Sequence, residues 1–249
     1  MTKTLILIPS RMAATRLPGK PLLKINNLSI ISHVFKRAEE ANIGEVIVAT
    51  DDQEILEDVI KNGGRAIITN KNHKTGTDRI FEAYKKLDIK NVDYILNLQG
   101  DEPDINKDDI IKLNNFMIDQ KAELGTLAAK IQDDKMLDNK NIVKVVTDKK
   151  LEENNFPTAL NFTRDNLSND NSNIYHHIGI YSYKINILEK LISLDQTVNE
   201  KKNKLEQLRA LDNMLKINVA LARFSPIGVD TEEDYLAIKK IMEYKISNE

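Results

Sequence analysis

The first half of this 249-residue chain alternates short apolar runs with amphipathic stretches, and this alternation constrains the fold more than any other feature. The apolar runs have the length of buried strands, and we expect strands at Thr4–Pro9, Glu45–Thr50, Arg65–Ile68 and Tyr94–Leu98. The stretches between them carry apolar residues at helical spacing, and we expect helices at Ile30–Asn42, from Asp52 to a stop at Gly63–Gly64, at Asp78–Leu87 and at Lys107–Gln120. Strands and helices at this spacing form βαβ units, so the sequence predicts an α/β fold with a mostly parallel central sheet flanked by helices.

The second half is richer in extended segments. We expect strands at Gly125–Ile131, Ile142–Thr147, Ala159–Thr163, Ile178–Tyr183 and Val219–Phe224, and helices at Ile185–Leu194, Lys204–Ile217 and Thr231–Ile246. The stretch Asp165–Asn173 is rich in Asn, Asp and Ser, which is typical of a surface loop. No shift in composition marks a linker, so we predict one domain over residues 1–249 with a smaller strand-rich subregion.

Composition excludes several functional classes. The chain has no cysteine, which rules out a disulfide framework, a thiolate zinc site and a cysteine nucleophile. A formal net charge of -2, an aromatic content of 5% and the lack of Trp argue against a nucleic-acid partner. No apolar run approaches the roughly 20 residues of a membrane helix, and the first residues do not match a signal peptide. We therefore expect a cytoplasmic protein with no membrane partner.

The loop after the first strand carries a cluster of positive charge. Ligands of parallel sheets bind beyond the carboxyl ends of the strands, so the segment Ser10–Pro21 is a candidate site. It holds Arg11, Arg16 and Lys20 among small residues. Arginine binds phosphate oxygens with a planar fork and lysine with a point charge, while backbone N–H groups add further donors. Three cations at one strand end favour phosphate binding over a solvated basic loop.

Two common phosphate motifs do not fit this part of the chain. Gly19–Lys20 resembles the end of a P-loop, but Pro21 stands where Ser or Thr is needed. No GxGxxG pattern follows the first strand, which disfavours a dinucleotide-binding fold. Without those glycines, Asp51 and Asp52 after the second strand are more typical of helix caps than of a ribose-binding acid.

Two carboxylates are candidates for a metal site. Asp101 follows the fourth expected strand, and Gly100 before it permits a close approach of the backbone. Asp230 follows the last expected strand, directly before the final helix. Mg²⁺ is commonly held by one or two carboxylates together with substrate phosphates and water. The alternatives are a turn capped by Asp101 and, for Asp230, an ordinary acid before a helix.

Six motifs follow one another in a fixed order over nearly the whole chain. They are Arg11–Pro21, Gly76–Arg79, Gln99–Pro103, His177–Tyr181, Leu205–Arg209 and Gly228–Thr231. The first motif alone is shared with other sugar nucleotidyltransferases, but the ordered set resembles the 3-deoxy-manno-octulosonate cytidylyltransferase (CMP-Kdo synthetase) family. The resemblance implies a glycosyltransferase-A-like nucleotidyltransferase fold and a Mg²⁺-dependent homodimer. It also implies transfer of CMP from CTP to 3-deoxy-D-manno-octulosonate (Kdo), with release of pyrophosphate, for lipopolysaccharide biosynthesis.

The same resemblance implies roles for individual residues. The nucleotide would be bound by Ser10, Arg11, Arg16, Lys20, Thr75, Gly76, Arg79, Gln99 and Asp101. The catalytic set would be Arg11, Lys20, Asp101 and Asp230, with Asp101 and Asp230 as metal ligands. The sugar would be bound by Arg164, His177, Glu206 and Gln207. Residues 1–125 would then form a nucleotide-binding half and residues 126–249 a sugar-binding and dimerisation half.

Alternatives remain open at both levels. A lone histidine in a strand, such as His177, is often structural, and Glu206 and Arg209 lie at i, i+3 on a helix, where they can pair at the surface. A related cytidylyltransferase could act on another acidic sugar, 8-amino-Kdo or sialate. A catalytically inactive nucleotide-binding protein on the same fold is the remaining alternative, and the retained acids and loop cations argue against it.

Overall fold

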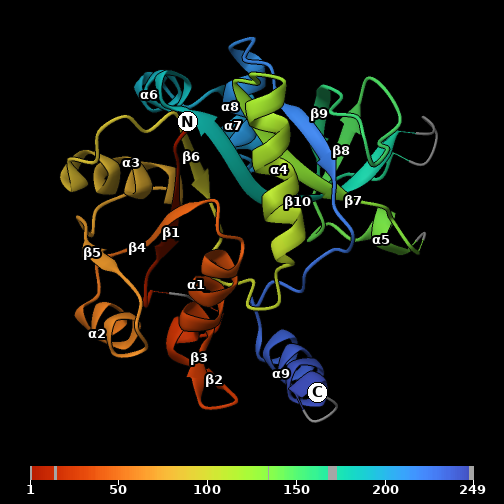
Figure 1. Ribbon diagram of the computed structural model, residues 1–249. Coiled ribbons are helices and arrows are strands. Elements are labelled where there is room, and N and C mark those ends of the chain that lie inside the picture. The colour runs from red at the N-terminus through yellow and green to blue at the C-terminus, as the bar shows by residue number, and fades with distance from the viewer. Residues whose placement is uncertain (1, 14–15, 134, 168–172, 247–249) are drawn as a thin grey trace. The chain divides into compact units, whose positions relative to one another are not determined.

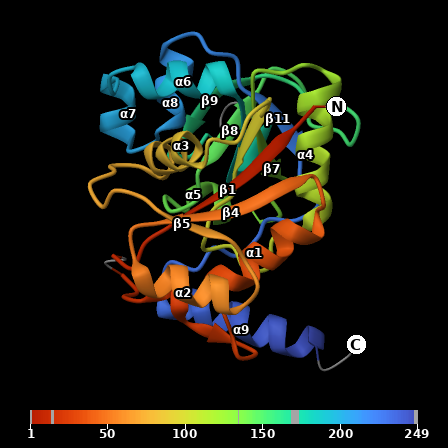
Figure 2. The same cartoon turned by 60° about the vertical axis from the view of Figure 1, so that its left-hand side comes forward.

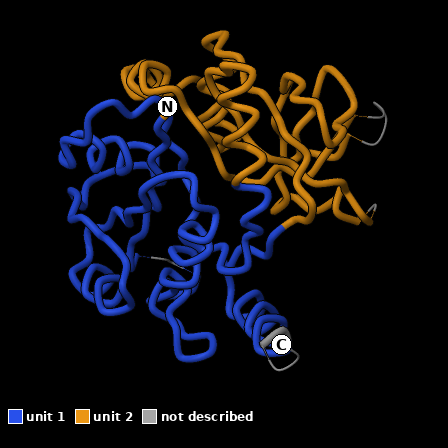
Figure 3. The backbone as a smooth tube through the Cα atoms, viewed as in Figure 1, with its two compact units in different colours: residues 1, 3–110, 226–249 blue, residues 2, 111–225 orange. Residues whose placement is uncertain are grey.

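The computed structural model describes residues 2–13, 16–133, 135–167 and 173–246 (Figure 1). Two residues of the cationic loop, Ala14 and Thr15, and part of the expected loop Asp165–Asn173 lie outside the described residues. The chain forms two compact units (Figure 3). Unit 1 comprises residues 3–110 and 226–249, and unit 2 comprises residues 111–225.

Unit 1 is built on a parallel sheet with the strand order β6-β1-β4-β5. The strands are β1 (Thr4–Ser10), β4 (Gly44–Thr50), β5 (Ala66–Ile68) and β6 (Tyr94–Asn97). The residues from Leu5 to Ile8 in β1 are fully buried, as expected for a parallel strand covered on both faces. Since the strands are parallel, Ser10, Thr50, Ile68 and Asn97 end at one edge of the sheet, where ligands of such sheets bind.

Helices cover both faces of this sheet. Figure 2 shows α3 (Gly76–Leu87) on one side of β1 and β4, with α1 (Ile30–Glu40) and α2 (Gln53–Lys61) on the other. Unit 1 also contains the short helix η1 (Lys20–Leu22), the hairpin strands β2 (Lys24–Ile25) and β3 (Leu28–Ser29), and α9 (Glu232–Ile246). Ile238 and Met242 of α9 pack with Ile25, Ile30 and Val229 in one core cluster, which anchors the end of the chain to the hairpin.

The chain passes into unit 2 within α4 (Lys107–Asp119). The strands of unit 2 are β7 (Leu124–Ala129), β8 (Lys144–Thr147), β9 (Ala159–Thr163), β10 (Ile174–Lys184) and β11 (Asn218–Leu221). β10 pairs antiparallel with β7 and with β8, β8 pairs antiparallel with β9, and β11 pairs parallel with β7. The helices are α5 (Lys135–Asp138), α6 (Ile185–Ser193), α7 (Val198–Asn203) and α8 (Gln207–Asp212).

The sequence predicts most of these elements to within a few residues but misses the short helices η1 and α5, and two further differences are larger. The expected helix Lys204–Ile217 is wrong: only Gln207–Asp212 is helical, and an unexpected helix, α7, precedes it. Lys204 has a left-handed backbone with φ of 53°, which ends α7 and separates the two helices. The hairpin β2–β3 was also not expected, and it turns at Asn26 and Asn27, both with positive φ.

The expected functional halves, residues 1–125 and 126–249, stay a prediction. The compact units divide within α4 and return the last helix to unit 1. Among the helices of the described residues, none is both long and apolar enough to cross a membrane.

Candidate active site

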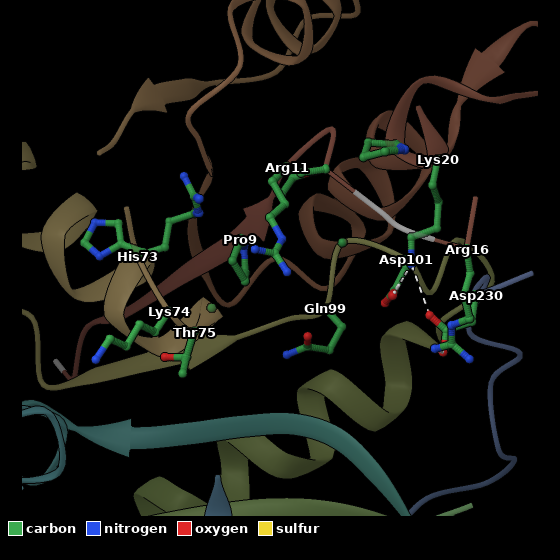
Figure 4. Close-up of a pocket in the computed structure, with 16 residues that line it drawn as sticks. Pro9, Arg11, Arg16, Lys20, His73, Lys74, Thr75, Gln99, Asp101 and Asp230 are labelled. Carbon is green, nitrogen blue, oxygen red and sulfur yellow. Dashed lines mark hydrogen bonds and ion pairs between the residues drawn. The ribbon is translucent and has the colours of Figure 1, made fainter. Parts of the chain in front are cut away.

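A pocket of about 410 Å³ opens at the carboxyl edge of the unit 1 sheet (Figure 4). Its walls come from the loop after β1, the start of α3, the turn after β6 and the segment before α9. All residues predicted to bind the nucleotide or the metal line it: Ser10, Arg11, Arg16, Lys20, Thr75, Gly76, Arg79, Gln99, Asp101 and Asp230. The volume is in the range of small-molecule binding sites.

Lys20 lies between the two predicted metal ligands. Its Nζ atom is 2.7 Å from Oδ2 of Asp101 and 3.4 Å from Oδ1 of Asp230. Nη2 of Arg16 is 2.9 Å from Oδ2 of Asp230, so Arg16, Lys20 and both acids form one cluster (Figure 4). Two acids far apart in the sequence therefore converge on one point of the pocket, as a shared metal ion requires.

The donor set fits Mg²⁺ bound together with a substrate. Within the described ranges, His, Cys, Asp and Glu side chains form no group of three or more that could hold a metal ion. The cluster offers only the carboxylates of Asp101 and Asp230, and both are partly exposed. Mg²⁺ is typically bound by one or two carboxylates, with phosphate oxygens and water completing its octahedron. The remaining ligands would come from the phosphates of a nucleotide and from solvent.

The backbone brings the two acids together through one tight turn and one hydrogen bond. A Cβ atom on Gly100 would lie 2.9 Å from the carbonyl oxygen of Pro9, so only glycine lets the turn after β6 approach the end of β1 this closely. The N–H group of Val229 donates to the carbonyl oxygen of Asp101 at 2.9 Å, which places Asp230 beside it. These two contacts fix the separation of the acids.

Asp230 does not act as the cap of the last helix. That role belongs to Thr231, whose hydroxyl accepts from the N–H of Asp234, while the Asp234 carboxylate accepts from the N–H of Thr231. The Asp230 carboxylate contacts Arg16 and Lys20 instead. A role of Asp230 in metal binding stays a prediction.

The third loop cation, Arg11, is in a different position from the other two. It is exposed, and among the described residues its side chain has no hydrogen-bond or ion-pair partner. Arg16 and Lys20 already contact carboxylates. Of the three loop cations, Arg11 is therefore unpaired within the described residues, whereas Arg16 and Lys20 are paired with acids.

Arg79 lines the pocket but is committed to the protein. Its side chain is 4% exposed, and Nη1 lies 3.0 Å from Oδ1 of Asp51 and donates to the hydroxyl of Thr69 at 2.7 Å. The carboxylate of Asp52 accepts from the N–H of Met12 at 2.8 Å and makes no cap hydrogen bond to α2. Asp52 is thus the N-cap residue of α2, as expected for one of the two acids, but its side chain holds the loop after β1 and does not cap the helix. Asp51 is not the cap, and its carboxylate holds the buried Arg79.

Thr75 and Gly76 place the start of α3 against the end of β1. The Thr75 hydroxyl accepts from the N–H of Asp78 at 3.1 Å, and the Asp78 carboxylate accepts from the N–H of Thr75 at 3.1 Å. A Cβ atom on Gly76 would lie 3.1 Å from Cγ of Pro9, so this contact also favours glycine. The capping box begins the helix at the wall of the pocket.

His73 and Lys74 also line the pocket, and the sequence analysis missed them. Nε2 of His73 contacts the carboxylate of Glu82, which also accepts from the N–H of Asn70 at 2.9 Å and from Lys86. Burial alone would raise the pKa of Glu82, but its hydrogen bonds to Lys86, Asn70 and His73 lower it to about 2. Glu82 is thus an anion that fixes the His73 ring. The partners are nine positions apart, and no sequence motif links a histidine before a helix to an acid within it.

Glu102, which follows Asp101, has opposite properties. Burial, with a smaller contribution from the negative charge of Asp101, raises its pKa to about 8. Its Oε2 atom is buried and has no hydrogen-bond partner among the described residues. A carboxyl group that is protonated at neutral pH is a poor Mg²⁺ ligand, which leaves Asp101 as the acid of this turn that faces the pocket.

The residues predicted to bind the sugar all lie in unit 2. His177 is 8% exposed, with Nε2 3.1 Å from the hydroxyl of Thr126 and its ring beside Phe162 and Tyr181. Burial lowers the pKa of His177 to about 3, with a smaller contribution from the neighbouring His176. It is neutral at physiological pH, so it can contact a sugar acid through a hydrogen bond but not through a positive charge.

Glu206 and Arg209 are within ion-pair distance as the alternative expected, but not at the surface, because Arg209 is buried. Arg209 is buried and forms a bidentate ion pair with Glu200 of α7, with Nε 2.8 Å from Oε2. Its nearest distance to Glu206 is 3.9 Å. Glu206 precedes α8 and Gln207 is the first residue of this helix, so the ion pair between α7 and α8 sets their position.

Tyr181 is a further side chain that the sequence analysis did not single out. Its hydroxyl is buried and has no hydrogen-bond partner in the described part of the chain. Burial, followed by the electrostatic effects of Tyr183 and Glu206, raises the pKa of Tyr181 well above its ordinary value. Its place within the motif that contains His177 was the only signal in the sequence.

Comparison with known proteins identifies the family. A family profile described as Cytidylyltransferase matches residues 5–217. A 3-deoxy-manno-octulosonate cytidylyltransferase from Rhodopseudomonas palustris (strain BisB18) is 44% identical over 97% of this chain and 98% of the relative. One from Thermodesulfovibrio yellowstonii is 42% identical over 96% of this chain and 98% of the relative. The chain belongs to the 3-deoxy-manno-octulosonate cytidylyltransferase family.

Solved structures support the same assignment. A structure of CMP:2-keto-3-deoxy-manno-octonic acid synthetase complexed with CTP matches this member of the family with a TM-score of 0.90 and 33% identity, over 98% of this chain and all of that one. A UDP-glucose pyrophosphorylase structure matches with a TM-score of 0.72 at 16% identity, which shows a shared fold alone. The predicted nucleotidyltransferase fold and family are therefore confirmed.

In this member of the cytidylyltransferase family, the predicted site residues fall into two groups, one in each unit. The nucleotide and metal set meets in one pocket of unit 1. The residues predicted to bind the sugar lie in unit 2: Arg164 directly follows β9, His177 is on β10, and Glu206 and Gln207 are at the start of α8. Their binding of a sugar remains a prediction.

Proposed function

We propose that this chain is a 3-deoxy-manno-octulosonate cytidylyltransferase, which transfers CMP from CTP to Kdo and releases pyrophosphate. The observation that carries the proposal is the Lys20 ammonium between Asp101 and Asp230, in a pocket that also holds Arg11 and Arg16. Cations and acids that alternate in one pocket suit a complex of a polyphosphate with a divalent metal. The names of the full-length relatives specify the nucleotide and the sugar.

The loop cations would stabilise the charge that develops on the leaving group. When the Kdo hydroxyl attacks the α-phosphorus of CTP, the bond to the β-phosphate oxygen breaks and pyrophosphate leaves with additional negative charge. Arg11, Arg16 and Lys20 stand where a triphosphate would contact them, and catalysis of such transfers depends mainly on positioning and charge neutralisation. Arg16 and Lys20 would exchange their carboxylate partners for phosphate oxygens.

Asp101 and Asp230 would hold Mg²⁺. Bound there, the ion would supply Lewis-acid polarisation of the α-phosphate. The two acids also keep the metal at the end of the pocket where Lys20 and Arg16 stand, so metal and cations would act on the same polyphosphate. Gly100 maintains this arrangement by allowing the turn of Asp101 to lie against β1.

Unit 2 would supply the contacts to the sugar. Kdo carries a carboxylate, and Arg164 is the cationic donor among the residues predicted to bind it. Nη1 of Arg164 donates to the backbone carbonyls of Lys140 and Asn141, and in the described residues no partner occupies Nε or Nη2. The neutral His177, Glu206 and Gln207 would bind hydroxyl groups. We extend the proposal to a cytoplasmic homodimer that serves lipopolysaccharide biosynthesis, on the basis of the family resemblance.

The deciding experiment measures pyrophosphate release from CTP, with Kdo, 8-amino-Kdo and sialate as acceptors and Mg²⁺ present. We expect release with CTP and Kdo, formation of CMP-Kdo by mass spectrometry, and little release when ATP, GTP or UTP replaces CTP. Faster turnover of 8-amino-Kdo or sialate would assign a different acidic sugar. CTP binding without release for any acceptor would support the inactive nucleotide-binding alternative. Light scattering on the purified protein tests the dimer.

A further inference from the structure

Unit 2 contains a buried cation that the proposed mechanism does not use. Lys144 lies on β8 and is 0% exposed, which makes it the largest fully buried side chain in the described part of the chain. An ammonium group loses its hydration when it is buried, so it is kept in a fold only where hydrogen bonds replace the lost water.

The hydrogen bonds of Lys144 go to the backbone around Arg164. Its Nζ atom donates to the carbonyl oxygen of Arg164 at 3.0 Å and to that of Asn139 at 2.9 Å. The Arg164 guanidinium in turn donates through Nη1 to the carbonyls of Lys140 at 3.1 Å and Asn141 at 3.0 Å. The buried Lys144 ammonium and the partly exposed Arg164 guanidinium thus both connect the segment 139–141 to the end of β9.

The register of the strands links the same position to His177. Lys144 pairs with Thr163 of β9 on one side and with His176 of β10 on the other. The N–H of His177 donates to the carbonyl of Val143 at 2.9 Å. Val143, directly before β8, and Lys144, its first residue, therefore hold the backbone at His177 and Arg164.

We infer that Lys144 is a positioning residue that holds Arg164 so that its remaining N–H groups can bind the carboxylate of the acidic sugar. The inference rests on the proposed function, since it takes Arg164 as the carboxylate donor. Lysine suits this task because its ammonium donates to two carbonyls at once, whereas a neutral side chain of similar length, such as methionine, fills the space and donates to neither. Without the hydrogen bonds of Lys144, the end of β9 loses its connection to the segment 139–141, which accepts hydrogen bonds from Arg164.

The test compares Lys144→Met, Arg164→Ala and the double variant in steady-state pyrophosphate release, with CTP and Kdo varied separately. We expect Lys144→Met to raise KM for Kdo about tenfold, in line with the loss of charge-assisted hydrogen bonds, and to leave KM for CTP within about twofold. The matched control is Lys150→Met, the same substitution on an exposed side chain outside this network, which should leave both KM values unchanged.

The double variant separates positioning from a merely structural role. If Lys144 acts through Arg164, Lys144→Met adds no further increase in KM for Kdo once Arg164 is alanine. Equal increases in both backgrounds, an unchanged KM for Kdo in Lys144→Met, or parallel changes in both KM values would overturn the inference. An Arg164→Ala variant with normal KM for Kdo would instead refute the assumed role of Arg164, and the inference with it.

Thermal unfolding of each variant shows whether the substitution is tolerated. Exchange of a buried charge for an apolar side chain of similar volume is often neutral or stabilising, so we expect Lys144→Met to fold. If it does not, Lys144→Gln replaces it under the same KM criterion, because its amide keeps a donor for one of the two carbonyls.

Discussion

The two units use charged side chains in opposite ways. In unit 1, Arg16, Lys20, Asp101 and Asp230 pair with one another at the rim of a pocket, and the side chains of Arg16 and Asp230 are 60% and 53% exposed. In unit 2, Lys144 and the pair of Glu200 and Arg209 are buried and bind backbone carbonyls or each other. Exposed pairs contribute little to stability and break easily, whereas breaking a buried pair is costly. The rim of the pocket in unit 1 therefore has ion pairs that break easily, whereas the buried charges of unit 2, like the buried Arg79 of unit 1, hold the fold.

The largest effect on the exchangeable charges should come from Asp101→Asn. Loss of one metal carboxylate removes several kcal/mol of transition-state stabilisation, so we expect turnover to fall about a thousandfold. The fold should survive, because the ion pair with Lys20 is partly exposed. Asp88→Asn, at the exposed left-handed C-cap of α3, is a matched control that should keep full activity. Near-normal turnover of Asp101→Asn at saturating Mg²⁺ would refute the metal assignment.

For the fixed charges of unit 2, we expect the reverse pattern. Glu200→Gln leaves Arg209 buried without its counter-ion, and the free energy of unfolding should fall by about 3 kcal/mol in urea denaturation. The double variant Glu200→Leu/Arg209→Met removes both charges and should recover most of this loss. A single-variant loss below about 1 kcal/mol would mean that this pair behaves like those of unit 1.

His177 should make the stability of unit 2 sensitive to acid. The pKa of His177 is lowered from 6.5 to about 3 in the folded protein. Between these two values the imidazole is protonated in the unfolded chain but not in the folded protein. The contribution is intact above pH 6.5 and is lost progressively as pH falls toward 3, by about 2 kcal/mol between pH 6.5 and 5. His177→Gln should lose less stability than the wild type between pH 7 and 5 in urea denaturation. Equal losses would contradict burial of a neutral ring.

The smallest effect concerns Arg16, the most exposed member of the pocket cluster. Arg16→Ala should raise KM for CTP about tenfold and change kcat little. The variant loses one phosphate contact and keeps those of Arg11 and Lys20. Arg37→Ala, which removes an exposed arginine paired with Glu40 on α1, is the control and should leave KM for CTP unchanged. A normal response of Arg16→Ala to CTP would remove this residue from the phosphate site.

The site in unit 1 was predictable because its residues follow strand ends. Parallel strands bring their carboxyl ends to one edge, so a cationic loop after β1 and Asp101 after β6 had to meet there. The partners of Asp51 and Asp52 were not predictable, since Arg79 and Met12 reach them only through the fold. Local sequence offers no pattern for such contacts.

In unit 2 the sequence predicted the strands but not the contacts of the buried charged side chains. Lys144 binds backbone carbonyls, which carry no sequence signal, and Glu200 reaches Arg209 across a break between helices. That break depends on the left-handed backbone of Lys204, where no glycine marks the end of α7. The helix Lys204–Ile217 was predicted from apolar spacing alone, and that spacing does not show that the chain turns at Lys204.

The anchoring of α9 on the hairpin also orders events during synthesis. The ribosome makes every cation of the pocket and Asp101 well before it reaches Asp230, and the docking of Ile238 and Met242 against Ile25 and Ile30 needs the helix that follows. A nascent or truncated chain that stops before α9 would leave Ile25 and Ile30 without the cover of Ile238 and Met242. The helix that completes this core is thus the last element to leave the ribosome, directly after the second acid of the pocket.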